Sequence, residues 1–115
     1  MANKVGVVLS TGGSLVARLA QFFPRATAVR IPVRLTGTNS HGNAFDEDTV
    51  IEYGTSSEVL FASTLPLEFG DRLRLENSDG SLHADTVIVA VQYHEEKRAV
   101  AARFARQISN WIIKP

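Results

Sequence analysis

Hydrophobic and polar residues alternate strictly over the segment from Ala28 to Thr36. One side carries Val29, Ile31, Val33 and Leu35, and the other carries Arg30, Pro32, Arg34 and Thr36. This period of two is typical of a strand with one buried face. The polar face therefore presents two guanidinium groups, which lie about 13 Å apart at a rise of about 3.3 Å per residue.

Proline cannot donate a hydrogen bond to a neighbouring strand, so Pro32 predicts that this strand lies at the edge of a sheet or at its entry. Two readings of its basic face stay open. Guanidinium groups are planar forks that suit phosphate, which makes the face a docking surface for a phosphorylated ligand. The more common alternative is the solvated outer face of an ordinary strand.

Extended segments separated by turn-forming residues continue along the chain. They lie at about residues 45–53, 59–62, 72–76 and 82–93, and a strong hairpin signal, Asn77-Ser78-Asp79-Gly80, precedes the last of them. The segment 98–104 fits a helix or a strand, and we predict a strand, followed by a short helical or irregular tail to Trp111. Because no long helices intervene, the pattern predicts an all-β barrel or sandwich over about residues 28–104.

The first 27 residues predict a different organisation. Residues 4–9 are predicted to form a short apolar strand, followed by a glycine-containing loop. Apolar residues then recur at helical spacing over 14–23, with Ser14 as the expected N-cap and Pro24 as the stop. The strand–loop–helix order resembles a phosphate-binding turn, but the required lysine and the G-x-G-x-x-G spacing are absent. We therefore expect a terminal helix that covers part of the sheet.

The hydrophobic pattern also predicts which side chains form the core. The predicted core residues are Leu15, Leu19, Phe22, Val33, Leu35, Ile51, Leu73, Leu75, Ile88 and Phe104. A chain of 115 residues with 44% hydrophobic residues is long enough for one domain with a core of its own.

Composition narrows the classes of function. The 12 basic and 12 acidic residues balance, which argues against a nucleic-acid partner. The absence of cysteine excludes disulfides and thiolate chemistry. No apolar run is long enough to span a membrane, and the N-terminus does not resemble a signal peptide, so we expect a cytoplasmic protein.

The order of these features resembles the PilZ domain family over about residues 25–115. The matching pieces are Arg30-Ile31-Pro32-Val33-Arg34, the junction from Gly54 to Val59, Leu67-Glu68-Phe69-Gly70-Asp71, the turn Asn77–Gly80, and a closing strand from Arg98 to Phe104. The resemblance implies a mainly β fold: a six-stranded antiparallel barrel over residues 28–115, with residues 1–27 as a strand and helix extension. It also implies a bacterial regulatory domain, since many members bind cyclic di-GMP and signal to a partner.

The sequence departs from the family's binding motifs. The ligand-binding arginines usually precede the first strand, whereas Arg30 and Arg34 lie within it and Arg25 lies nearer the usual place. The second motif, Asp/Asn-x-Ser-x-x-Gly, has lost its first and last residues in both registers, Gly54-x-Ser56-x-x-Val59 and Tyr53-x-Thr55-x-x-Glu58. Valine is unfavourable at positive φ, and Glu58 would repel a phosphate.

The candidate ligand-binding residues are Arg25, Arg30, Arg34 and Ser56. The alternative is that the three arginines are surface residues paired with the acids at 46–48. Asp46 and Asp48 share one strand face, but two carboxylates are few for a cation site, and the three histidines are widely separated. No Ser/His/Asp arrangement fits catalysis, so we expect no enzyme activity, no cofactor and no metal.

Two functions remain open. The first, which the eroded second motif favours, is a regulatory module that signals through a protein partner and binds cyclic di-GMP weakly or not at all. The second is a cyclic di-GMP receptor that uses Arg30 and Arg34. In that case the loss of either arginine would weaken binding about tenfold or more, because a charge-assisted hydrogen bond contributes about 1.5–3 kcal/mol.

Overall fold

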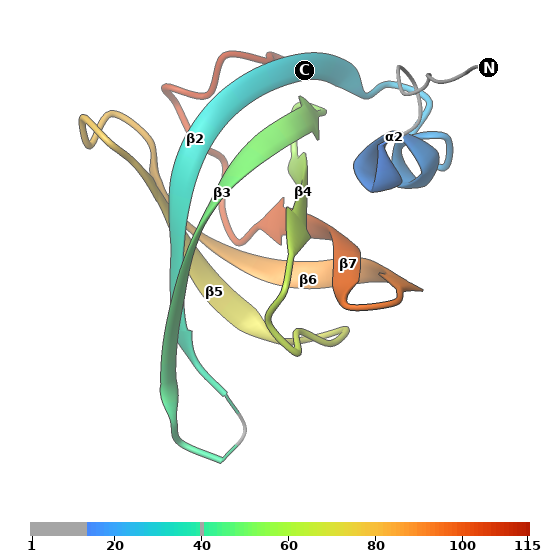
Figure 1. The fold of residues 1–115 in the computed structure, drawn as a ribbon. Coiled ribbons are helices and arrows are strands. Elements are labelled where there is room, and N and C mark those ends of the chain that lie inside the picture. Colours follow the sequence, from blue (N-terminus) through green and yellow to red (C-terminus); the bar gives the residue numbers. More distant parts are fainter. Residues whose placement is uncertain (1–13, 40) are drawn as a thin grey trace, which may run out of the picture.

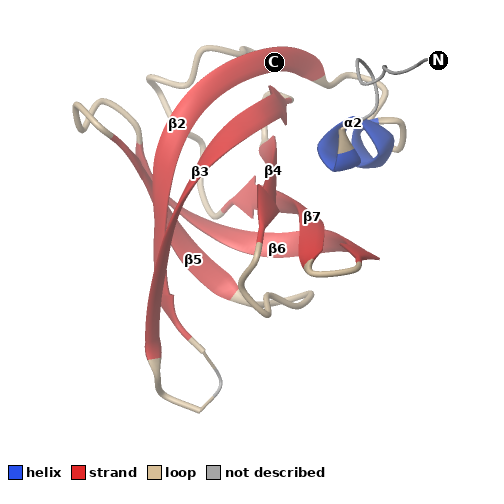
Figure 2. Ribbon diagram, in the orientation of Figure 1, coloured by secondary structure: helices blue, strands red, loops and turns tan. Residues whose placement is uncertain are grey.

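Six antiparallel strands close into a barrel, and one short helix packs on the outside of its wall (Figures 1 and 2). The computed structural model describes residues 14–39 and 41–115. The elements are α2 (Leu15–Ala20), β2 (Thr27–Thr38), β3 (Ala44–Gly54), β4 (Glu58–Ser63), β5 (Arg72–Asn77), β6 (His83–His94) and β7 (Lys97–Phe104). Their order around the barrel is β2-β3-β4-β7-β6-β5. The predicted six-stranded antiparallel barrel is confirmed, as is the strand over 98–104.

The alternation in β2 has its expected effect, because Val33 and Leu35 are buried in the barrel while Arg30, Pro32 and Arg34 are exposed. Of the two positions predicted for this strand, the edge of a sheet is wrong, since β2 has β3 on one side and β5 on the other. Pairing with β5 covers only Val33–Thr36, however. Pro32 lies just beyond that stretch and is paired with Val50 of β3, so its missing N–H leaves no gap in the β5 ladder.

Strands β4 and β7 are buried on both faces, which explains why their sequences do not alternate. Val59 and Phe61 belong to the core inside the barrel, whereas Leu60 belongs to a second cluster outside it. Helix α2 contributes Val16 and Leu19 to that outer cluster. The helix therefore covers an apolar patch of the wall at β4 and β7 (Figure 1).

The predicted helix over 14–23 is shorter in the structure. Ser14 is the N-cap, and its hydroxyl accepts a hydrogen bond from the Ala17 N–H at 2.9 Å. The helix ends at Ala20, and the N–H groups of Phe22 and Phe23 bond three residues back in a tight turn. Pro24 disfavours helical backbone at the residue before it, which explains the early end. The predicted strand over 4–9 and its loop up to residue 13 lie outside the described residues.

Eight of the ten predicted core residues are buried, and two are not. Phe22 is 73% exposed because it lies beyond the end of the helix, so its assignment to the core is wrong. Leu15 is only partly buried at the start of the helix.

Side chains, rather than a backbone ladder, join β3 to the C-terminal end of β4. The ladder between the two strands ends at the pair Ile51 and Phe61. Beyond it the Thr49 hydroxyl donates to the Ala62 carbonyl at 2.6 Å. The Glu47 carboxylate accepts from the hydroxyls of Ser63 and Thr64 and from the Thr64 N–H. These bonds close the barrel where the two strands diverge.

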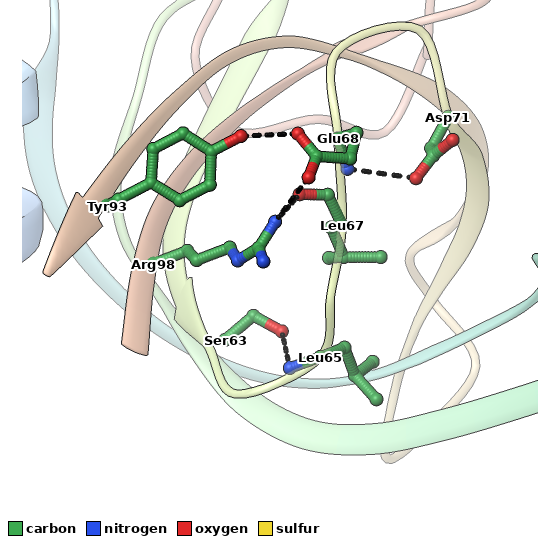
Figure 3. Close-up of polar contacts among 7 residues, drawn as sticks. All are labelled: Ser63, Leu65, Leu67, Glu68, Asp71, Tyr93 and Arg98. Atoms are coloured by element: carbon green, nitrogen blue, oxygen red, sulfur yellow. Dashed lines mark hydrogen bonds and ion pairs between the residues drawn. The ribbon is translucent and has the colours of Figure 1, made fainter. Parts of the chain in front are cut away.

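A polar cluster around Glu68 fixes the loop between β4 and β5 against β6 and β7 (Figure 3). The Glu68 carboxylate accepts hydrogen bonds from the Tyr93 hydroxyl and from Arg98, at 3.0 Å for the latter. Arg98 also donates to the Leu67 carbonyl at 2.6 Å, and its guanidinium lies 4.7 Å from the centre of the Tyr93 ring. Within the loop, the Glu68 N–H donates to Asp71 at 2.9 Å. We call Glu68, Tyr93 and Arg98 the Glu68 cluster.

Replacing Phe104 by alanine should strongly destabilise the barrel, while the same change at Phe22 should not. Phe104 is 8% exposed and packs edge-on against Trp111, so F104A should lower the free energy of unfolding by about 3–5 kcal/mol. F22A removes a largely exposed ring and should change it by less than about 0.5 kcal/mol. Urea unfolding followed by circular dichroism tests both, and equal midpoints would contradict the burial of Phe104.

The Glu68 cluster should weaken in acid. The hydrogen bond from Tyr93, and then that from Arg98, lower the pKa of Glu68 below its ordinary value of 4.5. A carboxyl group with a lowered pKa stabilises the folded state above its unfolded pKa, and this contribution is lost as the pH falls through the folded value. Amide exchange in residues 64–71, corrected for the intrinsic rate, should therefore accelerate below about pH 4.5. E68Q should remove this step, and the exposed control E96Q should retain it.

Candidate binding site at the loop between β3 and β4

The loop between β3 and β4 is a tight turn built around the Thr55 hydroxyl. Its oxygen accepts hydrogen bonds from the N–H groups of Ser57 at 3.1 Å and Glu58 at 2.9 Å. The Thr55 N–H in turn donates to the Glu58 carbonyl at 2.9 Å. Small hydroxyl residues favour such local bonds, so the segment Thr55–Ser57 folds back on itself and presents Ser56 and Ser57 at the surface.

The C-terminal tail holds this loop in place. The Trp111 indole N–H donates to the Thr55 carbonyl at 2.7 Å, and the ring is buried against Phe104 at a centroid distance of 5.4 Å. A Cβ atom at Gly54 would lie 2.8 Å from the Trp111 ring, so only glycine fits there. The Phe104 N–H also donates to the Ser57 carbonyl at 2.9 Å. The loop is thus bonded to the end of β7 and to the tail.

Glu58, at the end of the loop, occupies the position where the family motif has its closing glycine in one register. Its side chain is only 13% exposed. The carboxylate accepts from the Thr55 hydroxyl and from Arg103, whose Nη2 and Nε lie 2.8 and 3.1 Å away. The register of β4 and β7 places the two residues directly opposite each other. One negative charge is therefore built into the loop, and it engages the Arg103 guanidinium.

Two shallow hollows flank the loop. One, of about 350 Å³, is lined by Phe22, Arg25, Ser56 and Arg103 among others. The other, of about 580 Å³, is lined by Ser56, Ser57, Arg106 and Lys114 among others. The Ser56–Ser57 turn is shared by both, so it forms the ridge between them.

The structure brings together only two of the four predicted site residues. Arg25 and Ser56 line the same hollow. Arg30 lies in an irregularity of β2, between the pairs formed by Ala28 and Ile31, and is exposed outside both hollows. Arg34 bonds Asp46 at 3.0 Å and Asp48 at 2.9 Å. For Arg34, therefore, the alternative prediction of a surface arginine paired with the acids at 46–48 is correct. These carboxylates, Asp46 most strongly, raise the pKa of Arg34.

Sequence reasoning missed three cations at the site: Arg103, Arg106 and Lys114. Arg103 is exposed between buried Ala102 and Phe104, at the end of a strand whose central residues are buried on both faces. Its position opposite Glu58 follows from the strand order, in which β7 pairs with β4, and nothing local in the sequence signals that order. Arg106 and Lys114 lie in the irregular tail after β7, whose path is set by Trp111.

Other chemistries find less support in the part of the chain that the structure describes. Within it, no three His, Asp or Glu side chains gather as a metal site would require. Asp46 and Asp48, the carboxylates considered for a cation, both face Arg34. No helix among the described residues is long and apolar enough to cross a membrane.

The architecture, a closed six-stranded antiparallel barrel, is shared with solved structures of other proteins. No family model and no curated protein matches the chain. The structure is similar to the inhibitor of motility MotI/DgrA of Bacillus subtilis, with a TM-score of 0.53 and 14% identity over 73% of this chain and 42% of that one. It is also similar to MrkH of K. pneumonia in its apo state, with a TM-score of 0.51 and 14% identity over 73% and 44%. The chain thus spans less than half the length of either protein.

Removing the indole N–H should destabilise the loop. In W111F the buried Thr55 carbonyl loses its donor, so the free energy of unfolding should fall by about 1–3 kcal/mol. Amide exchange at residues 55–58 should accelerate more than at the Glu68 cluster, which lies at the opposite end of β4. The exposed control F69L should leave both unchanged, and a W111F protein as stable as the wild type would contradict the role of this bond.

Proposed function

We propose that this protein is a non-enzymatic, PilZ-like regulatory module that acts through protein contacts and binds cyclic di-GMP weakly or not at all. The observation that carries the proposal is the Glu58 carboxylate, which lies within the loop where the family's motif would meet a phosphate. A buried or half-buried carboxylate repels a phosphate more strongly than an exposed one, because solvent screens it less.

The arginines support the same conclusion. Arg103 bonds Glu58 through two nitrogens, and Arg34 bonds two aspartates. A nucleotide that recruited either group would have to break these ion pairs. Arg25 and the hydroxyls of the Ser56–Ser57 turn remain, and they provide attraction to phosphate without an acidic or amide partner for guanine at Gly54 or Tyr53.

A regulatory role also agrees with the structural neighbours. One of the similar structures is that of an inhibitor of motility, of which the matched part is 42% of the chain. The proposal for this chain is the broader class, a module that changes the behaviour of a partner, and it does not extend to motility.

Calorimetric titration with cyclic di-GMP at about 0.15 M salt tests the proposal. We expect no saturable heat, or a Kd above ~10 μM, because attraction to phosphate alone is weak and screened at this salt. Submicromolar affinity that persists at about 0.3 M salt would overturn the proposal. If that affinity fell about tenfold in R30A and in R34A, the receptor that uses these two arginines would replace it.

Replacing Glu58 should improve nucleotide binding if its charge is the obstacle. E58A removes the carboxylate and frees Arg103, so affinity should rise about fivefold or more, the effect of roughly 1 kcal/mol for a charge pair near 4 Å in water. E95A changes the net charge equally at the exposed turn between β6 and β7 and should have no effect. Equal changes in both variants would show that net charge, and not Glu58, limits binding.

A further inference from the structure

Positive side chains gather around the Ser56–Ser57 turn although the chain as a whole is neutral. The two hollows are lined by four cations, Arg25, Arg103, Arg106 and Lys114, and by a single acidic side chain, Glu58. Four positive charges and one negative charge leave a local excess of three. The complete chain has 12 basic and 12 acidic residues, so this excess is a property of the surface and not of the composition.

An exposed apolar side chain lies in the same region. Phe22 lines the smaller hollow and is 73% exposed. It is one of the four large hydrophobic residues that stand exposed in the described part of the chain. We call Phe22, Arg25, Ser56, Ser57, Arg106 and Lys114 the basic surface.

We propose that the basic surface binds an acidic peptide segment with interspersed apolar residues, supplied by a partner protein. The inference rests on the proposed function, for which it names the kind of partner and the place of contact. Carboxylates of the peptide would pair with Arg25, Arg106 and Lys114, and an apolar residue would cover Phe22. The Ser56 and Ser57 hydroxyls would contribute hydrogen bonds at the ridge.

The shape of the surface favours a peptide over a compact anion. A small ligand is usually enclosed in one pocket, whereas here two shallow hollows lie on opposite sides of a ridge. An extended peptide advances about 3.3 Å per residue and can cross the ridge with its side chains in both hollows. The cations are correspondingly distributed along the surface, and Arg103 is already paired with Glu58. Charge complementarity then selects an acidic segment.

Fluorescence anisotropy with a labelled twelve-residue peptide of Glu, Asp, Leu and Phe tests the inference on the full chain. Comparison probes are the same peptide with Gln and Asn in place of the acids, and vesicles with anionic lipid. We expect saturable binding of the acidic peptide in the range of tens of μM, with affinity that falls as salt rises. The Trp111 emission of the protein should change on binding, because the indole bonds the loop under the ridge.

Two variants with the same change in net charge locate the contact. The triple variant R25A/R106A/K114A removes three cations of the basic surface, and R18A/R30A/K97A removes three exposed cations that line neither hollow. The first should bind about tenfold more weakly, since each exposed ion pair contributes modestly and three are lost, while the second should stay within about twofold. Circular dichroism establishes that both remain folded.

A charge swap keeps the test open if the triple variant is unstable. R106E/K114E should lose the acidic peptide and gain affinity for a peptide in which Lys replaces Glu and Asp. The inference is overturned if both triple variants lose affinity equally, if the neutral peptide binds as well, if no saturable binding occurs up to about 1 mM, or if only vesicles bind. These results leave the calorimetric test of the proposed function unaffected, and submicromolar binding of cyclic di-GMP would overturn that function whatever the peptide does.

Discussion

The contact of the Trp111 indole with the loop between β3 and β4 is the constraint on which the candidate site depends. The indole N–H satisfies the buried Thr55 carbonyl, and its ring leaves room only for glycine at position 54. The same ring packs on Phe104 at the end of β7. One side chain therefore ties the tail, the closing strand and the loop together, and it fixes the positions from which Arg106 and Lys114 reach the surface.

Cross-strand ion pairs decide which cations remain available to a ligand. Two such ion pairs connect neighbouring strands: that of Arg34 with Asp46 and Asp48, and that of Arg103 with Glu58. The pair at Arg34 is about half exposed, and solvent-screened pairs of this kind add little to stability. Their larger effect is on function, since each one engages a guanidinium that could otherwise meet a phosphate, and Arg34 is one that the sequence alone offers to it. The cations without such a carboxylate partner among the described residues include Arg25, Arg106 and Lys114, and all three lie around the Ser56–Ser57 turn.

The sequence predicts the barrel well because strand alternation and turn residues are local signals. Val33, Leu35, Leu73 and Leu75 fall on the inner face as their spacing indicates. It fails at Phe22, where helical spacing continues past the last helical residue and only Pro24 signals the stop. The prediction of an edge strand from Pro32 also fails. A proline can lie within a strand of a closed barrel at a position where the strand on one side is no longer paired with it. The site is the least predictable part, since the register that places Glu58 opposite Arg103 arises from strands far apart in the chain.

The two ends of β4 are held by different chemistry. At the start of β4, the loop depends on an indole N–H, a threonine hydroxyl and backbone groups, none of which titrates near neutral pH. The Glu58 carboxylate, which accepts from the Thr55 hydroxyl and from Arg103, is the charged group of this end. At its other end, the Glu68 cluster depends on an ionised carboxylate and a protonated phenol, because the bond to Glu68 raises the pKa of Tyr93. The phenol contribution is present below its unfolded pKa and is lost only as the pH rises through the raised folded value. Between these acid and alkaline limits the contacts at both ends of β4 stay formed. The affinity of the basic surface near neutral pH should therefore depend on the salt concentration rather than on the pH.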